Sequence, residues 1–287
     1  MAKLLITGAS GQLGRQAIEV LAQKTDKSDI IAMVRSDAQA AVLARTGITT
    51  RYGDYNDPAS LAQAFAGIDR LLLVSGSDME NRVTHHKVAI AEAKTAGVKH
   101  IVYTSLLKAG DSPMPLAADH KVTEEFIAES GLSATILRNG WYSENMLMGL
   151  EQDLSMRQHF GAAADGKFSF ASRGDLAEAA AITLLGGYDG QTLELAGDEA
   201  LTMAEYTTIL SDIAGKPVAY VDMPQQAYQD ALVGAGLPEV FAAFLAATDA
   251  FAAQGALHDD SATLSRILGR PTTKMATVLK TALATQS

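Results

Sequence analysis

The stretch LLITGASGQLG (residues 4–14) places Gly8, Gly11 and Gly14 between a short apolar run and a helical pattern. Glycine loses much conformational entropy on folding, so three in one turn need a structural reason. Between a strand and a helix, such a turn lets backbone N–H groups approach a phosphate, and the helix N-terminus adds partial positive charge. The last glycine lets the helix pack closely on the strand. This placement favours a dinucleotide-binding turn over a plain bend.

Short apolar runs alternate with longer amphipathic segments through the first half of the chain. The apolar runs predict strands at residues 3–7, 30–34, 48–52, 70–75, 100–105 and 134–138. Helices are predicted at 12–24, 79–96 and 117–129, and Asp57-Pro58 predicts one that Gly67 ends. Strict alternation with continuous apolar strands is typical of a parallel sheet covered on both faces. We therefore expect an α/β fold with a Rossmann-like, doubly wound sheet, where ligands bind at the carboxyl ends of the strands.

The alternation becomes irregular in the second half. Asp175 is expected to cap an alanine-rich helix, and Thr202 with Glu205 forms a capping-box pattern before another. Strands are expected at 191–196 and 217–221, a helix at 238–253, and an exposed loop at 255–260. We expect a dinucleotide-binding domain at residues 1–140 and a smaller α/β substrate lobe at 141–287, whose elements can interleave with the first domain.

The composition excludes several classes of protein. The 287 residues carry a net charge of −10, which disfavours a nucleic-acid partner because an acidic surface repels phosphates. The absence of cysteine excludes disulfides, thiolate nucleophiles and cysteine-bound metals. No signal-peptide pattern follows Met1, and no window has the roughly 18 apolar residues of a membrane span. A cytoplasmic protein without a membrane span is expected; the sequence does not predict the oligomeric state.

Arg35 directly follows the second predicted strand, where an NAD site usually has an acidic residue for the ribose 2′-OH. Here the first acid is Asp37. An arginine at this position favours the 2′-phosphate of NADP through charge-assisted hydrogen bonds. The alternative is an ordinary surface arginine.

Several longer motifs resemble one family. They are TGASGQLG (7–14), VR (34–35), GDY (53–55), LLLVSG (71–76), AGVKHIVYTS (96–105), LRNGWYSEN (137–145) and ELAGD (194–198). Together they resemble the NmrA-like branch of the atypical short-chain dehydrogenases/reductases, and within it the group of NAD(P)H:quinone oxidoreductases type two and triphenylmethane reductase. The resemblance covers nearly the whole chain. LRNGWYSEN with AGVKHIVYTS is its most specific part, because the glycine motif is widely shared.

The resemblance implies NADPH bound across the strand ends. By position, the turn would hold the pyrophosphate, Arg35 the 2′-phosphate, and residues 75–77 the adenosine and ribose. Residues 139–144 would line the nicotinamide end, and Arg173 would reach back to the cofactor, although a plain surface arginine is equally consistent. The full set of cofactor-binding candidates is Gly8, Ser10, Gly11, Gln12, Leu13, Gly14, Arg35, Ser75, Gly76, Ser77, Thr104, His120, Asn139, Gly140, Trp141, Tyr142, Ser143, Glu144 and Arg173.

The chain departs from the wider superfamily at its Tyr-x-x-x-Lys motif. By register, Leu116 stands at the tyrosine position and His120 at the lysine position. Without that phenol, alcohol dehydrogenation and sugar epimerisation are disfavoured, unless Tyr103 or Tyr142 supplies one near the nicotinamide. Quinone reductases of the family also lack the pair, and a quinone accepts hydride readily. Catalysis would then be mainly positioning of the acceptor.

His120, Asn139 and Tyr142 are the candidate catalytic residues. A histidine with a pKa near neutrality can hydrogen-bond the nicotinamide ribose or assist protonation, but it can equally be a satisfied packing residue. Trp141 and Tyr142 can stack on a flat acceptor or simply pack the lobe. Ser143 and Asn145 are the nearest polar groups that could orient a carbonyl.

Two histidine segments and Ser105 do not predict a functional site. Adjacent His85 and His86 would diverge on a helix, and the His258 segment is a predicted loop, so no metal site is expected. Ser105 matches no Ser-His-acid arrangement. The sequence therefore favours an NADPH-dependent reductase that transfers hydride directly to a quinone or similar flat conjugated acceptor, without flavin. The alternative is a non-catalytic NADP(H)-binding redox sensor of the NmrA-like type.

Overall fold

A computed structural model describes residues 2–285 and contains a seven-stranded sheet in the order β3-β2-β1-β4-β5-β6-β9. Its strands are β1 (Leu4–Ile6), β2 (Ile30–Val34), β3 (Thr49–Tyr52), β4 (Arg70–Leu73), β5 (His100–Leu106), β6 (Ser133–Asn139) and β9 (Thr192–Leu195). The pairs from β1 to β6 are all parallel. The chain order reverses between β1 and β4, which is where a doubly wound sheet opens a crevice for a ligand. The expected fold class is confirmed.

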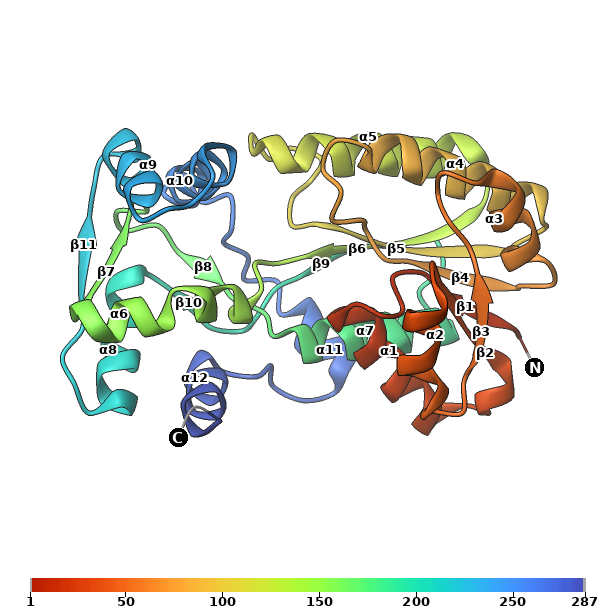
Figure 1. Cartoon of the computed structure of the whole chain (residues 1–287), viewed down its shortest axis with the longest axis horizontal. Coiled ribbons are helices and arrows are strands. Elements are labelled where there is room, and N and C mark those ends of the chain that lie inside the picture. The colour runs from red at the N-terminus through yellow and green to blue at the C-terminus, as the bar shows by residue number, and fades with distance from the viewer. Residues whose placement is uncertain (1, 286–287) are drawn as a thin grey trace. The chain divides into compact units, whose positions relative to one another are not determined.

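Helices cover both faces of this sheet. Figure 1 shows α3, α4 and α5 on one face and α1 with α7 on the other. Their bounds are α1 (Gln12–Lys24), α2 (Asp37–Ala44), α3 (Pro58–Phe65), α4 (Arg82–Thr95), α5 (Pro115–Ser130) and α7 (Arg173–Leu185), with a 3₁₀ turn η1 (Lys27–Asp29) before β2. All residues of β1 and β2 are buried, as expected for strands covered on both sides. The core on the α3–α5 face includes Leu5, Leu71, Ile101, Phe65 and Ile90.

Local sequence signals fix most helix ends. Asp57 caps α3 by accepting the Ser60 N–H, Pro58 is its first residue, and Gly67 follows it with a φ of +70°. At the start of α8 (Met203–Ala214), both hydrogen bonds of the Thr202–Glu205 capping box are present. The expected cap at Asp175 is wrong. α7 begins two residues earlier, and Asp175 is buried in its first turn.

The chain divides into two compact units that are not continuous in sequence. The first comprises residues 1–110, 116–139 and 173–193, and the second comprises 111–115, 140–172 and 194–287. The expected boundary at residue 140 coincides with one of the crossings between the units, after residues 111–115 have already belonged to the second. Residues 173–193 then return to the first unit, because α7 packs on α1 and leads into β9 at the sheet edge. Among residues 2–285, no helix is long and apolar enough to cross a membrane.

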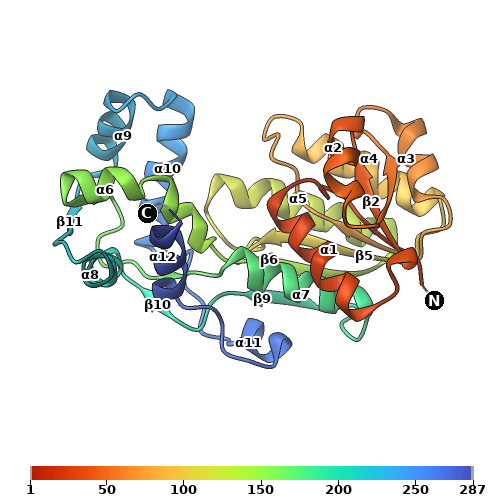
Figure 2. The same ribbon diagram turned by 60° about the horizontal axis from the view of Figure 1, so that its bottom comes forward.

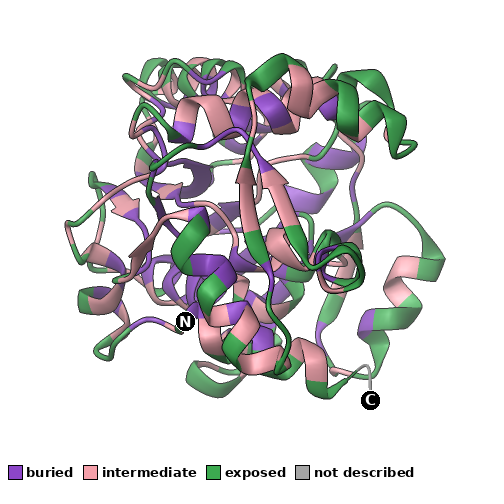
Figure 3. Ribbon diagram, turned by 90° about the vertical axis from the view of Figure 1, so that its left-hand side faces the viewer, coloured by how far each residue is buried: buried purple, intermediate pink, exposed green. Residues whose placement is uncertain are grey.

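The second unit contains small sheets and short helices. β8 (Phe168–Ser169) pairs with β10 (Ala200–Leu201) antiparallel, and β7 (Gln158–Gly161) pairs with β11 (Ala219–Asp222) parallel. The pair β7–β11 is only partly buried (Figure 3). α9 and α10 lie side by side (Figure 2). The helices are α6 (Leu150–Met156), α8, α9 (Gln225–Gly234), α10 (Glu239–Ala252), α11 (Thr263–Leu268) and α12 (Met275–Ala284), after a 3₁₀ helix η2 (Ser143–Met148).

Candidate cofactor and active site

The turn between β1 and α1 uses each glycine differently. Gly8 has a φ of +58°, a left-handed conformation that favours glycine. Gly11 donates its N–H to the Gly8 carbonyl over 2.9 Å and closes the turn. A Cβ on Gly14 would clash with the Gly8 carbonyl oxygen and lie 2.9 Å from its carbon. The spacing in the sequence thus corresponds to three backbone requirements.

The N-terminus of α1 lies at this turn and has no side-chain cap. Its N-cap is Gly11, and its first turn contains no acidic residue. The first N–H groups of a helix lack partners within it, and the helix dipole is positive at this end. Ser10 is half-buried, Gln12 is exposed and Leu13 packs in the core. This cradle of glycine and free backbone donors fits the pyrophosphate of a dinucleotide.

Arg35 lies directly after β2 with its side chain exposed. Its backbone N–H donates to Gln39 Oε1 over 2.8 Å, which ties it to the first turn of α2. Ser36 caps that helix by accepting the Gln39 N–H. Within residues 2–285, the Arg35 guanidinium makes no hydrogen bond or ion pair. An exposed guanidinium beside a helix N-terminus is suited to a phosphate group.

Ser75, Gly76 and Ser77 follow β4 at the same edge of the sheet. Ser75 and Gly76 are half-buried and Ser77 is exposed. Thr104 on β5 is buried, accepts the Ser75 N–H over 2.8 Å and donates to Ser75 Oγ over 3.3 Å. Thr104 therefore holds this loop in place.

His120 on α5 is buried in a cluster of aromatic and imidazole side chains. Its Nδ1 lies 2.8 Å from Tyr103 Oη, which is also 3.5 Å from His86 Nδ1. His86 Nε2 accepts the Gly76 N–H over 3.1 Å, so the hydrogen of the neutral His86 ring is on Nδ1. With the Tyr103 hydroxyl donating to His120 Nδ1, the neutral His120 ring carries its hydrogen on Nε2.

Burial decides the charge of this cluster. Burial, with the nearby Arg82 guanidinium, lowers the pKa of His120 to about 3. The same two causes lower the pKa of His86 to about 3. The expectation that His120 has a pKa near neutrality is therefore wrong. Burial also raises the pKa of Tyr103, whose side chain is fully buried. His120 is thus a neutral hydrogen-bond donor, and Tyr103 does not replace the missing phenol at Leu116.

Asn139 ends β6 at the carboxyl edge of the sheet. It is 3% exposed, yet neither its Oδ1 nor its Nδ2 has a hydrogen-bond partner among residues 2–285. A buried, unpaired amide is costly and indicates a missing partner. One donor and one acceptor side by side complement a carboxamide, which is the polar group of a nicotinamide.

Ser105 is hydrogen-bonded to the carboxylate of Glu124, and among residues 2–285 no histidine takes part in this pair. Its Oγ donates to Glu124 over 2.5 Å, and Arg138 forms an ion pair of 2.7 Å with the same carboxylate. Glu124 and Arg138 line a pocket of about 550 Å³ along α5 and β6. The Ser-His-acid arrangement of a hydrolase is not formed here.

Residues 140–144, predicted to line the nicotinamide end, belong to the second unit. A Cβ on Gly140 would lie 3.1 Å from the Leu195 carbonyl oxygen, so this chain crossing is tightly packed. The Ser143 hydroxyl is buried and has no hydrogen-bond partner in the part of the chain that the structure describes. Tyr142 and Glu144 are half-buried. Tyr142 forms a parallel bridge with Ala171.

Trp141 begins a row of aromatic rings that the sequence did not predict. Its ring centroid lies 6.3 Å from that of Phe244, which lies 6.2 Å from that of Phe241. Both phenylalanines are on α10, three residues apart, so they share one face of the helix. The three-residue spacing of the two phenylalanines was the signal in the sequence for their shared face. It could not predict the contact with Trp141, which lies about 100 residues away in the chain.

The remaining candidates are accounted for as follows. Arg173 is the first residue of α7 and is half-buried. His85 contacts Asn56 Oδ1 over 3.1 Å. In the part of the chain that the structure describes, no group of three His, Cys, Asp or Glu side chains could hold a metal ion.

The sequence profile of the NmrA-like family matches residues 1–277. The chain belongs to the NmrA-like family. This NmrA-like protein is 45% identical over 274 residues to Quinone oxidoreductase 2 of Escherichia coli (strain K12), covering 95% of this chain and 96% of that one.

Solved structures of two relatives are similar to this chain along nearly its whole length. One is an NADPH-dependent quinone oxidoreductase from Escherichia coli complexed with NADPH, with 44% identity, a TM-score of 0.95 and 98% and 99% coverage of this chain and that one. Another is the Citrobacter triphenylmethane reductase complexed with NADP(H), with 35% identity, a TM-score of 0.94 and 98% and 100% coverage.

Proposed function

We propose that this NmrA-like protein is an NADPH-dependent oxidoreductase that reduces quinones or similar flat conjugated acceptors. The observation that carries the proposal is the 45% identity to a quinone oxidoreductase along nearly the whole of both chains. The likeness to a reductase of triphenylmethane dyes supports the wider class of flat acceptors. NADPH supplies the hydride, and no flavin is required.

The residues at the strand ends fit this cofactor. The glycine turn and the N-terminus of α1 would hold the pyrophosphate, and Arg35 would bind the 2′-phosphate that distinguishes NADPH from NADH. Ser75 and Ser77 would face the adenosine and ribose. The unpaired amide of Asn139 would bind the nicotinamide carboxamide.

The chain's own contribution to the reaction is positioning and hydrogen bonding. The Nε2–H of His120, oriented by Tyr103, would donate to the nicotinamide ribose or to the acceptor oxygen that gains negative charge. Because His120 is neutral, the proton for the reduced acceptor would come from water. Trp141 and Tyr142 would stack on the flat acceptor.

The test is to mix purified protein with NADPH and a panel of benzoquinones and naphthoquinones and to follow NADPH absorbance. Cofactor binding is titrated in parallel by fluorescence. Quinone-dependent oxidation well above the rate without protein is expected, with NADPH preferred over NADH. Tight NADPH binding without turnover of any acceptor would contradict the proposal and support the redox-sensor alternative.

That alternative is not favoured. The relatives at 45% and 30% identity along more than nine tenths of both chains are named an oxidoreductase and an azoreductase. The similarity to NmrA itself, at 16% identity, shows the fold alone. A cytoplasmic location and the absence of a nucleic-acid partner stay predictions.

A further inference from the structure

The loop after β4 is held by side chains instead of by the sheet. β4 ends at Leu73, yet the next three backbone N–H groups are all paired. The N–H of Val74 donates to Thr7 Oγ1 over 3.0 Å, and that of Ser75 to Thr104 Oγ1 over 2.8 Å. The third, that of Gly76, donates to His86 Nε2. These three donors are therefore not available to a ligand.

Gly76 is held from both sides by α4. Its N–H donates to His86 Nε2 over 3.1 Å, and its carbonyl oxygen accepts from Arg82 Nε over 2.8 Å. Arg82 and His86 are four residues apart, so they lie on one face of the helix, and both are buried. Arg82 also forms an ion pair of 3.1 Å with Asp119 on α5.

The pairing leaves His86 a single arrangement. Thr123 Oγ1 donates to the Asp119 carbonyl, so it accepts from His86 Nδ1, 3.1 Å away. His86 thus accepts from Gly76 at one nitrogen and donates at the other, as only the neutral ring can. A protonated His86 would lose its bond to the loop.

We propose that Arg82 and His86 are positioning residues that clamp Gly76 and so fix the loop on which the adenosine and ribose of the cofactor rest. The inference rests on the proposed function. The N–H groups of Val74, Ser75 and Gly76 are paired within the protein, so this part of the loop offers the cofactor carbonyl oxygens and the Ser75 hydroxyl. A carbonyl oxygen only accepts hydrogen bonds, so it suits ribose hydroxyls and an adenine amino group but not a phosphate.

Four variants test the clamp. Arg82→Met and His86→Ala each remove one bond to Gly76, and we expect the Kd for NADPH to rise about 10-fold or more. His86→Gln keeps an acceptor for the Gly76 N–H and should recover much of the affinity. Asp119→Asn is the matched control: it weakens the ion pair but leaves the Arg82–Gly76 bond, so its Kd should stay near that of the unmodified protein.

Hydrogen exchange of the cofactor-free protein gives a readout that does not depend on activity. The Gly76 amide should exchange slowly although it lies in a loop, and His86→Ala should accelerate it without affecting the amides of β5. Fast exchange of Gly76 in the unmodified protein would overturn the clamp even if a variant fails to fold. So would unchanged NADPH affinity in Arg82→Met and His86→Ala, or an equal loss in Asp119→Asn. Failure of the proposed function is separate, since there the unmodified protein itself would not reduce quinones.

Discussion

At the scale of single residues, Arg35 and His120 show how surroundings assign a role. Arg35 is exposed beside the N-terminus of α2, where an anion is favoured. His120 is buried near Arg82, which keeps it neutral and leaves a hydrogen-bond donor in place of an acid. We therefore propose that Arg35 binds the cofactor through its charge and that His120 acts through a directed hydrogen bond.

If Arg35 binds the 2′-phosphate through its charge, reversing that charge should weaken the binding of NADPH but not of NADH. Arg35→Glu replaces an attractive partner of the 2′-phosphate by a repulsive one, and should weaken NADPH binding by about 2 kcal/mol or more, roughly 30-fold in Kd. NADH, which lacks this phosphate, should bind nearly as before. Fluorescence titration with both cofactors measures the difference.

Arg45→Glu is the matched control, since Arg45 is exposed at the other end of α2 and gives the same change in net charge. It should leave both affinities nearly unchanged. An equal loss of NADPH and NADH affinity in Arg35→Glu would show that Arg35 does not read the phosphate.

At the scale of elements, the site depends on what ends each strand. β1 ends in the glycine turn, β2 in Arg35, β4 in the Gly76 loop and β6 in Asn139. Because the strands are parallel, these ends lie along one edge of the sheet. The elements therefore bring together groups that are far apart in the chain.

The contact between α1 and the glycine turn can be tested at Gly14. Gly14→Ala places a Cβ against the Gly8 carbonyl, which neither backbone can relieve without shifting. We expect a loss of about 1–3 kcal/mol in stability and much weaker NADPH binding. Thermal unfolding and NADPH titration measure the two effects.

Gly149→Ala is its control, because a Cβ there meets nothing within 4 Å and the φ of −100° suits alanine. It should unfold at nearly the same temperature as the unmodified protein. A Gly14→Ala variant that binds NADPH normally would exclude the close packing as a requirement of the site.

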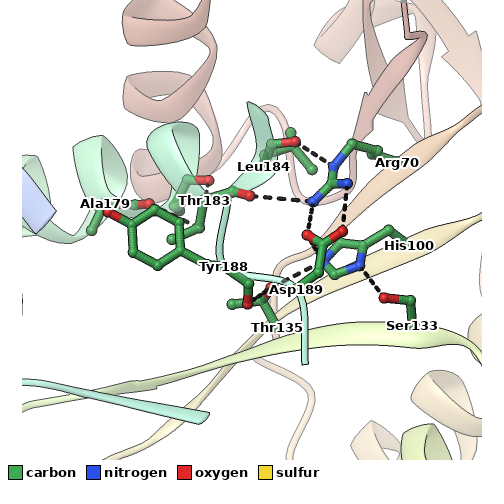
Figure 4. A network of polar contacts seen from close by, with 10 residues as sticks. Arg70, His100, Ser133, Thr135, Ala179, Thr183, Leu184, Tyr188 and Asp189 are labelled. Atoms are coloured by element: carbon green, nitrogen blue, oxygen red, sulfur yellow. Dashed lines mark hydrogen bonds and ion pairs between the residues drawn. The ribbon is translucent and has the colours of Figure 1, made fainter. Parts of the chain in front are cut away.

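At the scale of the whole molecule, buried polar groups couple folding to pH. Figure 4 shows one such network, formed where β4, β5 and β6 begin. Arg70 forms an ion pair of 2.7 Å with Asp189, and His100 contacts Ser133 Oγ and Thr135 Oγ1, each over 2.9 Å. His100 is 2% exposed. This network joins β4, β5 and β6 to the segment between α7 and β9.

Acid should destabilise the fold through its buried histidines. Burial and the nearby Arg70 lower the pKa of His100 to about 4, from 6.5 in the unfolded chain. Between these two pKa values, His100 binds more protons in the unfolded state than in the folded state. Its contribution to the stability is therefore fully present above pH 6.5 and is lost as the pH drops towards 4. His86 and His120 act in the same direction, whereas Asp249, whose pKa burial raises to about 6, opposes them.

The measurement is the unfolding temperature from about pH 8 to about pH 5. It should fall on acidification, and His100→Gln should reduce the slope. His85→Gln, at a half-buried histidine outside these networks, serves as the control. A slope that is the same in all three proteins would exclude His100 as a source of the acid sensitivity.

The sequence by itself determined the strands of the main sheet, β1 to β6 and β9, together with the glycine turn and the position of Arg35. These follow from local rules, because apolar periodicity, caps and glycine geometry act within a few residues. Tertiary structure alone decided the neutral state of His120, the unpaired amide of Asn139 and the two bonds from Arg82 and His86 to Gly76. Each depends on burial and on partners from other elements, which are 6 and 10 residues away for Gly76 and farther for His120. The return of residues 173–193 to the first unit has the same cause, since it is packing between distant segments that places them there.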